Sequence, residues 1–325
     1  MLNSSPQPWR LAMAAHKPVN LAQSLRGLKP KDKSPASARV LHTWIAQAQD
    51  RLGSAGPRLG WLVAATVVTA ALQRAVDESG TALFLLKGGT MLQYLLPDMS
   101  RTTQDIDGLV RGDIDRFLTE LDATLAEPWG PLTLVRGEVE TLDVPHRLVK
   151  PRRFDMTVLL NGVTWRRVQI EVSPDEGHAG TTPEQIPAPS LSGFGLPSPD
   201  HLVSLSMRYQ IAQKVHASTD PHDPPAFVND RARDVVDLLL LRTLTETTGH
   251  PLLTEIRTAV EDIFAARAAE AEATDAPSRS WPARLTIHPH WGPSFANAAD
   301  SASLAITLAD AVAKVNAWLD LIEDA

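Results

Sequence analysis

The chain has 325 residues, a formal net charge of −7 and no cysteine. Hydrophobic residues make up 43% and charged residues 21% of it, which is typical of a globular protein with one large domain or two ordinary ones. The lack of cysteine excludes a disulfide framework, a thiolate metal site and a cysteine nucleophile. The acidic balance argues against a general affinity for nucleic-acid backbones and leaves room for a local basic surface.

Residues 1–38 are rich in Pro, Ser, Lys and Arg, and only Asp32 carries a negative charge. This composition predicts a flexible basic N-terminal arm, either an unstructured leader or a contact for nucleic acid or a partner. No apolar segment of a secretory signal follows the basic start. The longest apolar run, Trp61 to Leu72, is too short to span a bilayer and predicts a buried helix. We therefore expect a cytoplasmic protein without membrane contact.

The first half of the chain alternates helical and strand patterns. Two helices are expected between residues 39 and 77, and the continuous apolar run 82–86 predicts a buried strand. The following segments are expected to be a helix over 91–96, a strand over 105–110 and an amphipathic helix over 113–125. Strands 154–160 and 163–172 then flank Asn161-Gly162, the strongest short-range hairpin signal. This order predicts an α/β (α+β) fold with a mixed sheet.

The character of the chain changes after a loop-like segment, 174–197. Ser198-Pro199 is typical of a helix N-terminus and predicts a helix that runs to about Ser218. Further helices are expected over 230–247, 251–271 and 303–323. The sequence therefore predicts a mixed-sheet domain over 39–195 and a helical C-terminal domain over 196–325, with a site in the cleft between them.

Lys87-Gly88-Gly89-Thr90 lies where the buried strand passes into a helix. Glycines there let the backbone approach a ligand, and the helix N-terminus offers free N–H groups for phosphate. A purely structural turn explains a glycine pair equally well, and no Walker loop is present because the Gly-Lys-Ser/Thr ending is missing.

Asp105 and Asp107 alternate with Ile106 in the second strand, so both carboxylates are expected on one face. Neighbouring like charges raise each other's pKa unless a cation lies between them, and Mg²⁺ or Mn²⁺ prefers such oxygen ligands. A third carboxylate can ligate a metal or take a proton from an attacking hydroxyl. We favour Glu171 for this role because it lies near the end of its strand, and Asp155 on the other hairpin strand is the competitor.

Lys-Gly-Gly-Thr-x-Leu followed by Arg-x-Thr-x-Asp-Ile-Asp resembles the signature of the AbiEii/AbiGii toxin nucleotidyltransferases, which include the MenT toxins. These proteins belong to the DNA polymerase β-type nucleotidyltransferase superfamily. The resemblance continues in Ala212-Gln-Lys214-Val-His-Ala217 and in Arg233-Asp234-Val-Val-Asp237-Leu238. It covers about residues 82–245.

Matched position by position, the resemblance implies roles for individual side chains. Catalysis would involve Asp105, Asp107, Glu171, Lys214 and Asp234. Nucleotide binding would involve Lys87, Gly88, Gly89, Thr90, Thr103 and Lys214, and the metal would be held by Asp105, Asp107 and Glu171. Thr103 matches a hydroxyl that some family members have phosphorylated by a partner antitoxin. The implied activity is Mg²⁺-dependent transfer of a nucleotide from an NTP to a tRNA 3′ end by a toxin that a cognate antitoxin neutralises.

Several alternatives remain at this stage. Lys214 emerges from an apolar helix stripe and could be an ordinary surface lysine. Asp234 and Asp237 near a helix start could serve only the helix dipole. A basic cluster around the hairpin could hold RNA or only protect a solvated sheet edge; it comprises Arg147, Lys150, Arg152, Arg153, Arg166 and Arg167. The acceptor could be a small molecule or a protein hydroxyl, and a catalytically silent binding module is the rival of another class.

Overall fold

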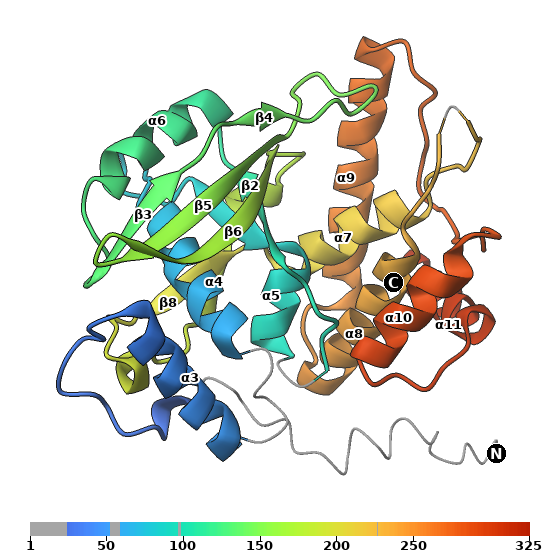
Figure 1. The fold of residues 1–325 in the computed structure, drawn as a ribbon. Helices are drawn as coiled ribbons and strands as arrows, with labels where there is room; N and C mark the ends of the chain where they lie inside the picture. Colours follow the sequence, from blue (N-terminus) through green and yellow to red (C-terminus); the bar gives the residue numbers. More distant parts are fainter. Residues whose placement is uncertain (1–24, 53–58, 97–98, 226) are drawn as a thin grey trace.

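The computed structural model describes residues 25–52, 59–96, 99–225 and 227–325. A mixed sheet lies at the centre, with strand order β3-β5-β6-β2-β1-β8-β7 and β4 paired to β5 (Figure 1). Its strands are β1 (Phe84–Lys87), β2 (Asp105–Val110), β3 (Leu132–Arg136), β4 (Glu140–Thr141), β5 (Arg152–Leu160), β6 (Val163–Pro174), β7 (Glu184–Pro187) and β8 (His201–Ser204). β2 runs parallel to β6 and antiparallel to β1, which confirms the mixed α/β fold class.

The helices are α3 (Ala38–Leu52), α4 (Leu59–Leu72), α5 (Gly88–Leu95), α6 (Ile114–Leu125), α7 (Met207–Ser218), α8 (Ala232–Thr248), α9 (Leu253–Ala273), α10 (Trp291–Ser301) and α11 (Leu308–Glu323). Helices α4 and α6 pack on the sheet, whereas α7 to α11 gather beside it as a separate group (Figure 1). No helix in the described ranges is both long and apolar enough to cross a membrane.

The central strand β1 is buried on both faces, which explains its unbroken apolar sequence. Phe84 and Leu86 belong to the hydrophobic cluster under α4 and α6, and Leu85 belongs to the cluster of the C-terminal helices. In β2, Ile106 faces the first cluster and Leu109 faces the second. Since side chains alternate along a strand, Asp105 and Asp107 share the face of Leu109 and look toward the C-terminal helices.

The expected hairpin is confirmed. Asn161 and Gly162 both have positive φ, at 50° and 79°, and join β5 to the antiparallel β6. The tight turn requires that conformation at both positions, which Asn and Gly adopt most readily. The turn brings β6 back antiparallel to β5.

The prediction of a helix that begins at Ser198 is wrong over its first turns. The strand β8 occupies His201–Ser204, and α7 begins only at Met207. The Ser198 hydroxyl accepts a hydrogen bond from the Leu191 N–H at 2.8 Å and does not cap the helix. Pairing with β1 outweighs the local helix signal, because the edge of a central strand needs backbone partners, and the Leu205 N–H donates to the Leu86 carbonyl at 2.8 Å.

Part of the expected N-terminal arm, residues 1–24, lies outside the described residues. The remainder is docked on the domain: Leu25 is fully buried, and the Lys31 N–H donates to the Ser192 carbonyl at 3.0 Å. From Leu205 onward the buried hydrophobic residues belong to the second hydrophobic cluster, which also includes Leu85, Leu92 and Leu109 from the sheet part of the chain. The division into two domains stays a prediction.

Candidate active site

The central feature of the site is a group of three carboxylates that lie close together on two neighbouring strands. Asp107 on β2 is the register partner of Glu171 on β6, and Asp105 lies two residues before Asp107. Directly paired residues on adjacent strands point to the same face, so the three side chains project together. The competing carboxylate, Asp155, pairs with Gln169 on the far side of β6 and forms an ion pair with Arg167 at 3.8 Å. β6 therefore separates Asp155 from the Asp105–Asp107 pair.

Two of these carboxylates are already hydrogen-bonded by the protein. Arg153 donates from Nε and Nη2 to Glu171 Oε1, at 2.9 Å and 2.7 Å. The Thr103 hydroxyl donates to Asp105 Oδ1. Glu171 is consequently anchored toward β5, and Asp105 is oriented by the residue two positions before it.

The environment of Asp107 disfavours its ionised form. The pKa of Asp107 is raised to about 6, chiefly because the surrounding protein withdraws water from the carboxylate and secondly because Asp105 carries a like charge. Lys87 acts in the opposite direction but does not cancel these effects. A cation placed between the two aspartates would offset both effects, because it favours the ionised forms of the carboxylates.

The residues present fit a Mg²⁺ ion held by one or two carboxylates together with water and substrate phosphates. They do not form a closed protein cage: among the described residues no group of three or more His, Asp or Glu side chains stands ready to hold a metal ion. The bond from Arg153 to Glu171 gives a physical reason. Glu171 would have to leave that arginine, or share it, to become a third ligand.

The glycine turn stands directly against this acidic pair. Gly88 has a φ of 71°, and a Cβ atom added there would overlap the Asp107 carboxylate. Only glycine allows both the left-handed backbone and the close approach. The Gln210 side chain on α7 fixes the turn, accepting from the Gly88 N–H at 3.1 Å and donating to the Gly88 carbonyl at 3.3 Å.

The other residues of the turn, Gly89 and Thr90, pack against the start of β2. The Thr90 hydroxyl is buried and donates to the Asp105 carbonyl at 2.7 Å. A Cβ atom at Gly89 would lie 3.2 Å from Thr103 Cβ, so a small residue is needed there. Thr90 and Thr103 thus contact Asp105, and Gly89 contacts Thr103, while the predicted contact of these three residues with nucleotide stays a prediction.

Lys87 precedes the turn and is the cross-strand partner of Asp107. Its ammonium donates to the Ser173 hydroxyl at 2.6 Å, and burial lowers the pKa of Lys87. The side chain thus brings a desolvated positive charge to the edge of the acidic site.

Lys214 on α7 lies in a buried network with two aspartates of α8. Its ammonium donates to Asp234 Oδ1 at 2.7 Å and to Asp237 Oδ2 at 2.6 Å. Arg101 binds the same Asp237 carboxylate through Nε at 3.0 Å and Nη2 at 3.2 Å. Asp237 is fully buried and thereby joins Lys214 to the segment that leads into β2.

The network favours the charged forms of Lys214 and Asp234. Burial alone would lower the pKa of Lys214, but Asp234 and Asp237 outweigh it and the pKa is raised. For Asp234 the effect of burial is likewise overcome, mainly by Lys214, and its pKa is lowered. An ammonium has three donors; Asp234 and Asp237 use two, and the third has no hydrogen-bond partner among the described residues.

These residues surround a cavity of about 340 Å³ between the sheet and the helices α7 and α8. Its walls include most of the side chains named by the sequence: Lys87, Gly88, Asp105, Asp107, Glu171, Lys214 and Asp234. The sequence did not point to Arg101, Gln210 or Arg231, which also line it. Arg101 belongs to the Arg-x-Thr-x-Asp motif, which was the available signal, whereas nothing local distinguishes Gln210.

A mixed sheet that brings a carboxylate pair against a glycine turn and a buried lysine is the arrangement of a nucleotidyltransferase. Residues 70–314 match the family model described as "Nucleotidyl transferase AbiEii toxin, Type IV TA system". The chain belongs to this family of nucleotidyltransferase toxins. Membership of a type IV toxin–antitoxin family implies an antitoxin as partner.

Two solved structures are similar to the chain at low sequence identity. The first is MenT4, a nucleotidyltransferase toxin from Mycobacterium tuberculosis H37Rv, with 14% identity, a TM-score of 0.46, and coverage of 87% of this chain and 96% of that chain. The second is JHP933 from Helicobacter pylori, with 12% identity, a TM-score of 0.38, and coverage of 81% and 92%. No curated protein matches the sequence significantly.

Proposed function

We propose that this protein transfers a nucleoside monophosphate from an NTP to the 3′ end of an RNA acceptor, a tRNA, in a Mg²⁺-dependent reaction. It would act in this way as the toxin of a toxin–antitoxin or phage-defence system. The observation that carries the proposal is the Asp105–Asp107 pair, with the pKa of Asp107 raised to about 6, directly against the turn at Gly88. NTPs and tRNA are found in the cytoplasm, and the activity would belong there.

Asp105 and Asp107 would hold the metal ion, with Glu171 as third ligand or as base. Mg²⁺ or Mn²⁺ held by these carboxylates would supply positive charge at the site where the pyrophosphate leaves. The close contact between Gly88 and Asp107 supports this assignment, because it holds the glycine turn directly beside the carboxylates that would bind the metal ion.

Lys214 would bind the triphosphate with its remaining donor, while Asp234 and Asp237 hold it in place. Lys87 and the backbone of Gly88 and Gly89 would lie along the same phosphates. The two carboxylates around Lys214 explain why Asp234 would be essential without touching the reacting atoms. Loss of either carboxylate would free the ammonium from its position.

In the reaction, the acceptor hydroxyl oxygen would attack the α-phosphorus in line with the leaving group. A new P–O bond forms to the acceptor, the bond to the pyrophosphate oxygen breaks, and the hydroxyl proton passes to a carboxylate. Glu171 is suited to take that proton because its Oε2 forms no hydrogen bond to another described residue, whereas Oε1 is held by Arg153. Pyrophosphate leaves with its charge balanced at Lys214.

The test is transfer of label from each α-labelled NTP to total cellular RNA in the presence of Mg²⁺, with wild type and Asp107→Asn side by side. We expect label in small RNA with wild type only, and with one NTP preferred. The same NTPs labelled at the γ-position should transfer nothing. Label in the protein or small-molecule fraction instead of RNA would move the acceptor assignment to that class, and no Asp107-dependent label in any fraction would favour a silent binding module.

A further inference from the structure

Most side chains of the basic hairpin cluster already have a carboxylate partner in the protein. The pairs are Arg147 with Glu176, Lys150 with Asp143, Arg152 with Asp115, Arg153 with Glu171 and Arg167 with Asp155. This pairing lowers the positive charge that the cluster offers to an RNA acceptor and directs attention to phosphate contacts elsewhere at the active site.

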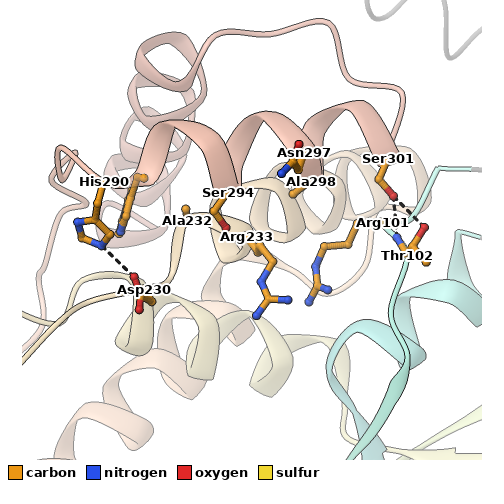
Figure 2. A pocket seen from close by; sticks show the side chains of 11 residues that line it. Arg101, Thr102, Asp230, Ala232, Arg233, His290, Ser294, Asn297, Ala298 and Ser301 are labelled. Carbon is orange, nitrogen blue, oxygen red and sulfur yellow. Dashed lines mark hydrogen bonds and ion pairs between the residues drawn. The ribbon is translucent and has the colours of Figure 1, made fainter.

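A second cavity, of about 630 Å³, adjoins the active-site cavity. It lies between α10, the start of α8 and the segment that leads into β2 (Figure 2). Arg101, Asp230 and Arg233 line both cavities, so the two are in contact. Its other polar side chains come mainly from α10: Ser294, Asn297 and Ser301. Its volume falls within the range of about 300–1,000 Å³ that is usual for small-molecule sites.

Hydrogen bonds join the rim of this cavity to the segment just before β2, the strand that carries Asp105 and Asp107. The Thr102 N–H donates to the Ser301 hydroxyl at 2.8 Å, and the two hydroxyls lie 3.0 Å apart (Figure 2). At the other end of α10, His290 Nε2 lies 3.0 Å from Asp230 Oδ1. Thr102 is three residues before Asp105, so the cavity wall continues directly into the acidic pair.

One arginine that lines the cavity, Arg233, has no acidic partner among the described residues. Arg233 forms no hydrogen bond or ion pair with any other residue in the described ranges, and its guanidinium lies next to that of Arg101 below α10 (Figure 2). Arg101 uses Nε and Nη2 on Asp237, which leaves Nη1 without a described partner. Among the described residues of the lining, the carboxylate is that of Asp230, and its Oδ1 lies 3.0 Å from His290 Nε2.

Guanidinium groups together with serine hydroxyls and an asparagine amide are the side chains that bind phosphodiester oxygens. The triphosphate has its own groups in the first cavity, since neither Lys87 nor Gly88 nor Lys214 lines the second. We propose that the second cavity is the acceptor subsite and binds the backbone phosphates next to the reactive 3′ hydroxyl of a single-stranded RNA end. This inference rests on the RNA acceptor proposed above.

The test compares Ser294→Glu with Ala296→Glu in the full-length enzyme. Both residues are exposed on α10, but only Ser294 lines the cavity, so the two variants add the same charge inside and outside it. KM for tRNA and KM for the NTP are measured separately, with the melting temperature as a folding control. We expect Ser294→Glu to raise KM for tRNA about tenfold while KM for the NTP stays within about twofold, and Ala296→Glu to match wild type.

Arg233→Gln gives a second readout that does not depend on turnover. Removing one phosphate contact should lower the slope of log binding affinity for tRNA against log salt concentration by about one, measured without NTP. Ala296→Glu should leave that slope unchanged.

Three results would overturn the subsite. If wild type labels RNA and Ser294→Glu behaves like Ala296→Glu, the acceptor binds elsewhere while RNA transfer stands. If Ser294→Glu raises KM for the NTP instead, the cavity belongs to the nucleotide. If wild type transfers nothing to RNA, the proposed function fails and the subsite fails with it.

Discussion

Asp107 and Glu171 face each other across the parallel pair of β2 and β6, at the level where the sheet meets the helices α7 and α8. Asp107 stands against the Gly88 turn, and Glu171 is held from the other side by Arg153. The pair thus joins a carboxylate whose pKa is raised chiefly by desolvation to one that already binds the Arg153 guanidinium. A metal ion and Arg153 would compete for Glu171, and this competition sets the role that Glu171 can play.

Glu171→Gln should lower turnover by about 100-fold or more if Glu171 ligates metal or accepts the proton. Asp155→Asn is the matched control, because Asp155 lies on the same sheet face but across β6 from the acidic pair. It should leave turnover within about twofold. The measurement is the single-turnover rate of nucleotide transfer, and equal losses in the two variants would remove Glu171 from the proposed machinery.

Asp107→Asn should inactivate the enzyme and yet stabilise the metal-free protein at neutral pH. A carboxyl whose pKa is raised to about 6 in the folded state contributes favourably at low pH and loses that contribution as pH rises through 6. At pH 7.5 the substitution removes this penalty, a gain of order 1–3 kcal/mol, and near pH 4 the two proteins should be equally stable.

The measurement is urea unfolding of both proteins between pH 4 and pH 8, with and without Mg²⁺. Mg²⁺ should stabilise wild type at pH 7.5 and lose this effect as pH falls through about 6, because protons compete for the Asp107 carboxylate. An Asp107→Asn variant that is less stable than wild type at pH 7.5 without metal would contradict the account.

Gly88→Ala should abolish activity, whereas Gly162→Ala should not. Both glycines have positive φ, at 71° and 79°, so each substitution costs about 1–2 kcal/mol in backbone strain. Only at Gly88 does the new Cβ overlap the Asp107 carboxylate, because nothing lies within 4 Å of a Cβ at Gly162. Transfer rates normalised to folded protein separate strain from displacement. Comparable activity in both variants would show that the contact between Gly88 and Asp107 is dispensable.

Asp237→Ala should be strongly destabilising, by about 3–5 kcal/mol, because it leaves the buried Lys214 and Arg101 without their shared carboxylate. The control is Asp122→Ala, which breaks the far more exposed ion pair with Arg136 and should cost less than about 1 kcal/mol. Chemical unfolding gives both values. Losses of similar size in the free energy of unfolding would mean that the buried network around Asp237 stabilises the fold no more than an exposed ion pair does.

The site strands could be predicted because their signals are local. The alternation in Asp105-Ile106-Asp107 fixes which side chains share a face, and Asn161-Gly162 fixes the hairpin. The register of β6 on β2 follows from contacts along the whole strand, so the level of Glu171 beside Asp107 could only be guessed from its place near the strand end. The sequence analysis favoured Glu171 over Asp155, and its role stays a prediction.

The parts that were missed depend on contacts between distant segments. β8 forms only because β1 offers an edge to pair with, and α10 begins with Trp291-Gly292-Pro293, a pattern typical of a loop. Burial of Trp291 and Phe295 holds that helix in place. Arg101 and Asp237 are 136 residues apart, so the network that holds Lys214 has no signature in any single stretch of sequence.

The most direct test of the central claim uses tRNA whose 3′ terminal diol has been oxidised with periodate, beside untreated tRNA. The enzyme is incubated with Mg²⁺ and the α-labelled NTP that it prefers, and label in the tRNA is counted. The account predicts label in untreated tRNA and none in oxidised tRNA, because the attacking hydroxyl has been removed. Equal label in both would contradict transfer to the 3′ end, and label in neither would contradict a tRNA acceptor.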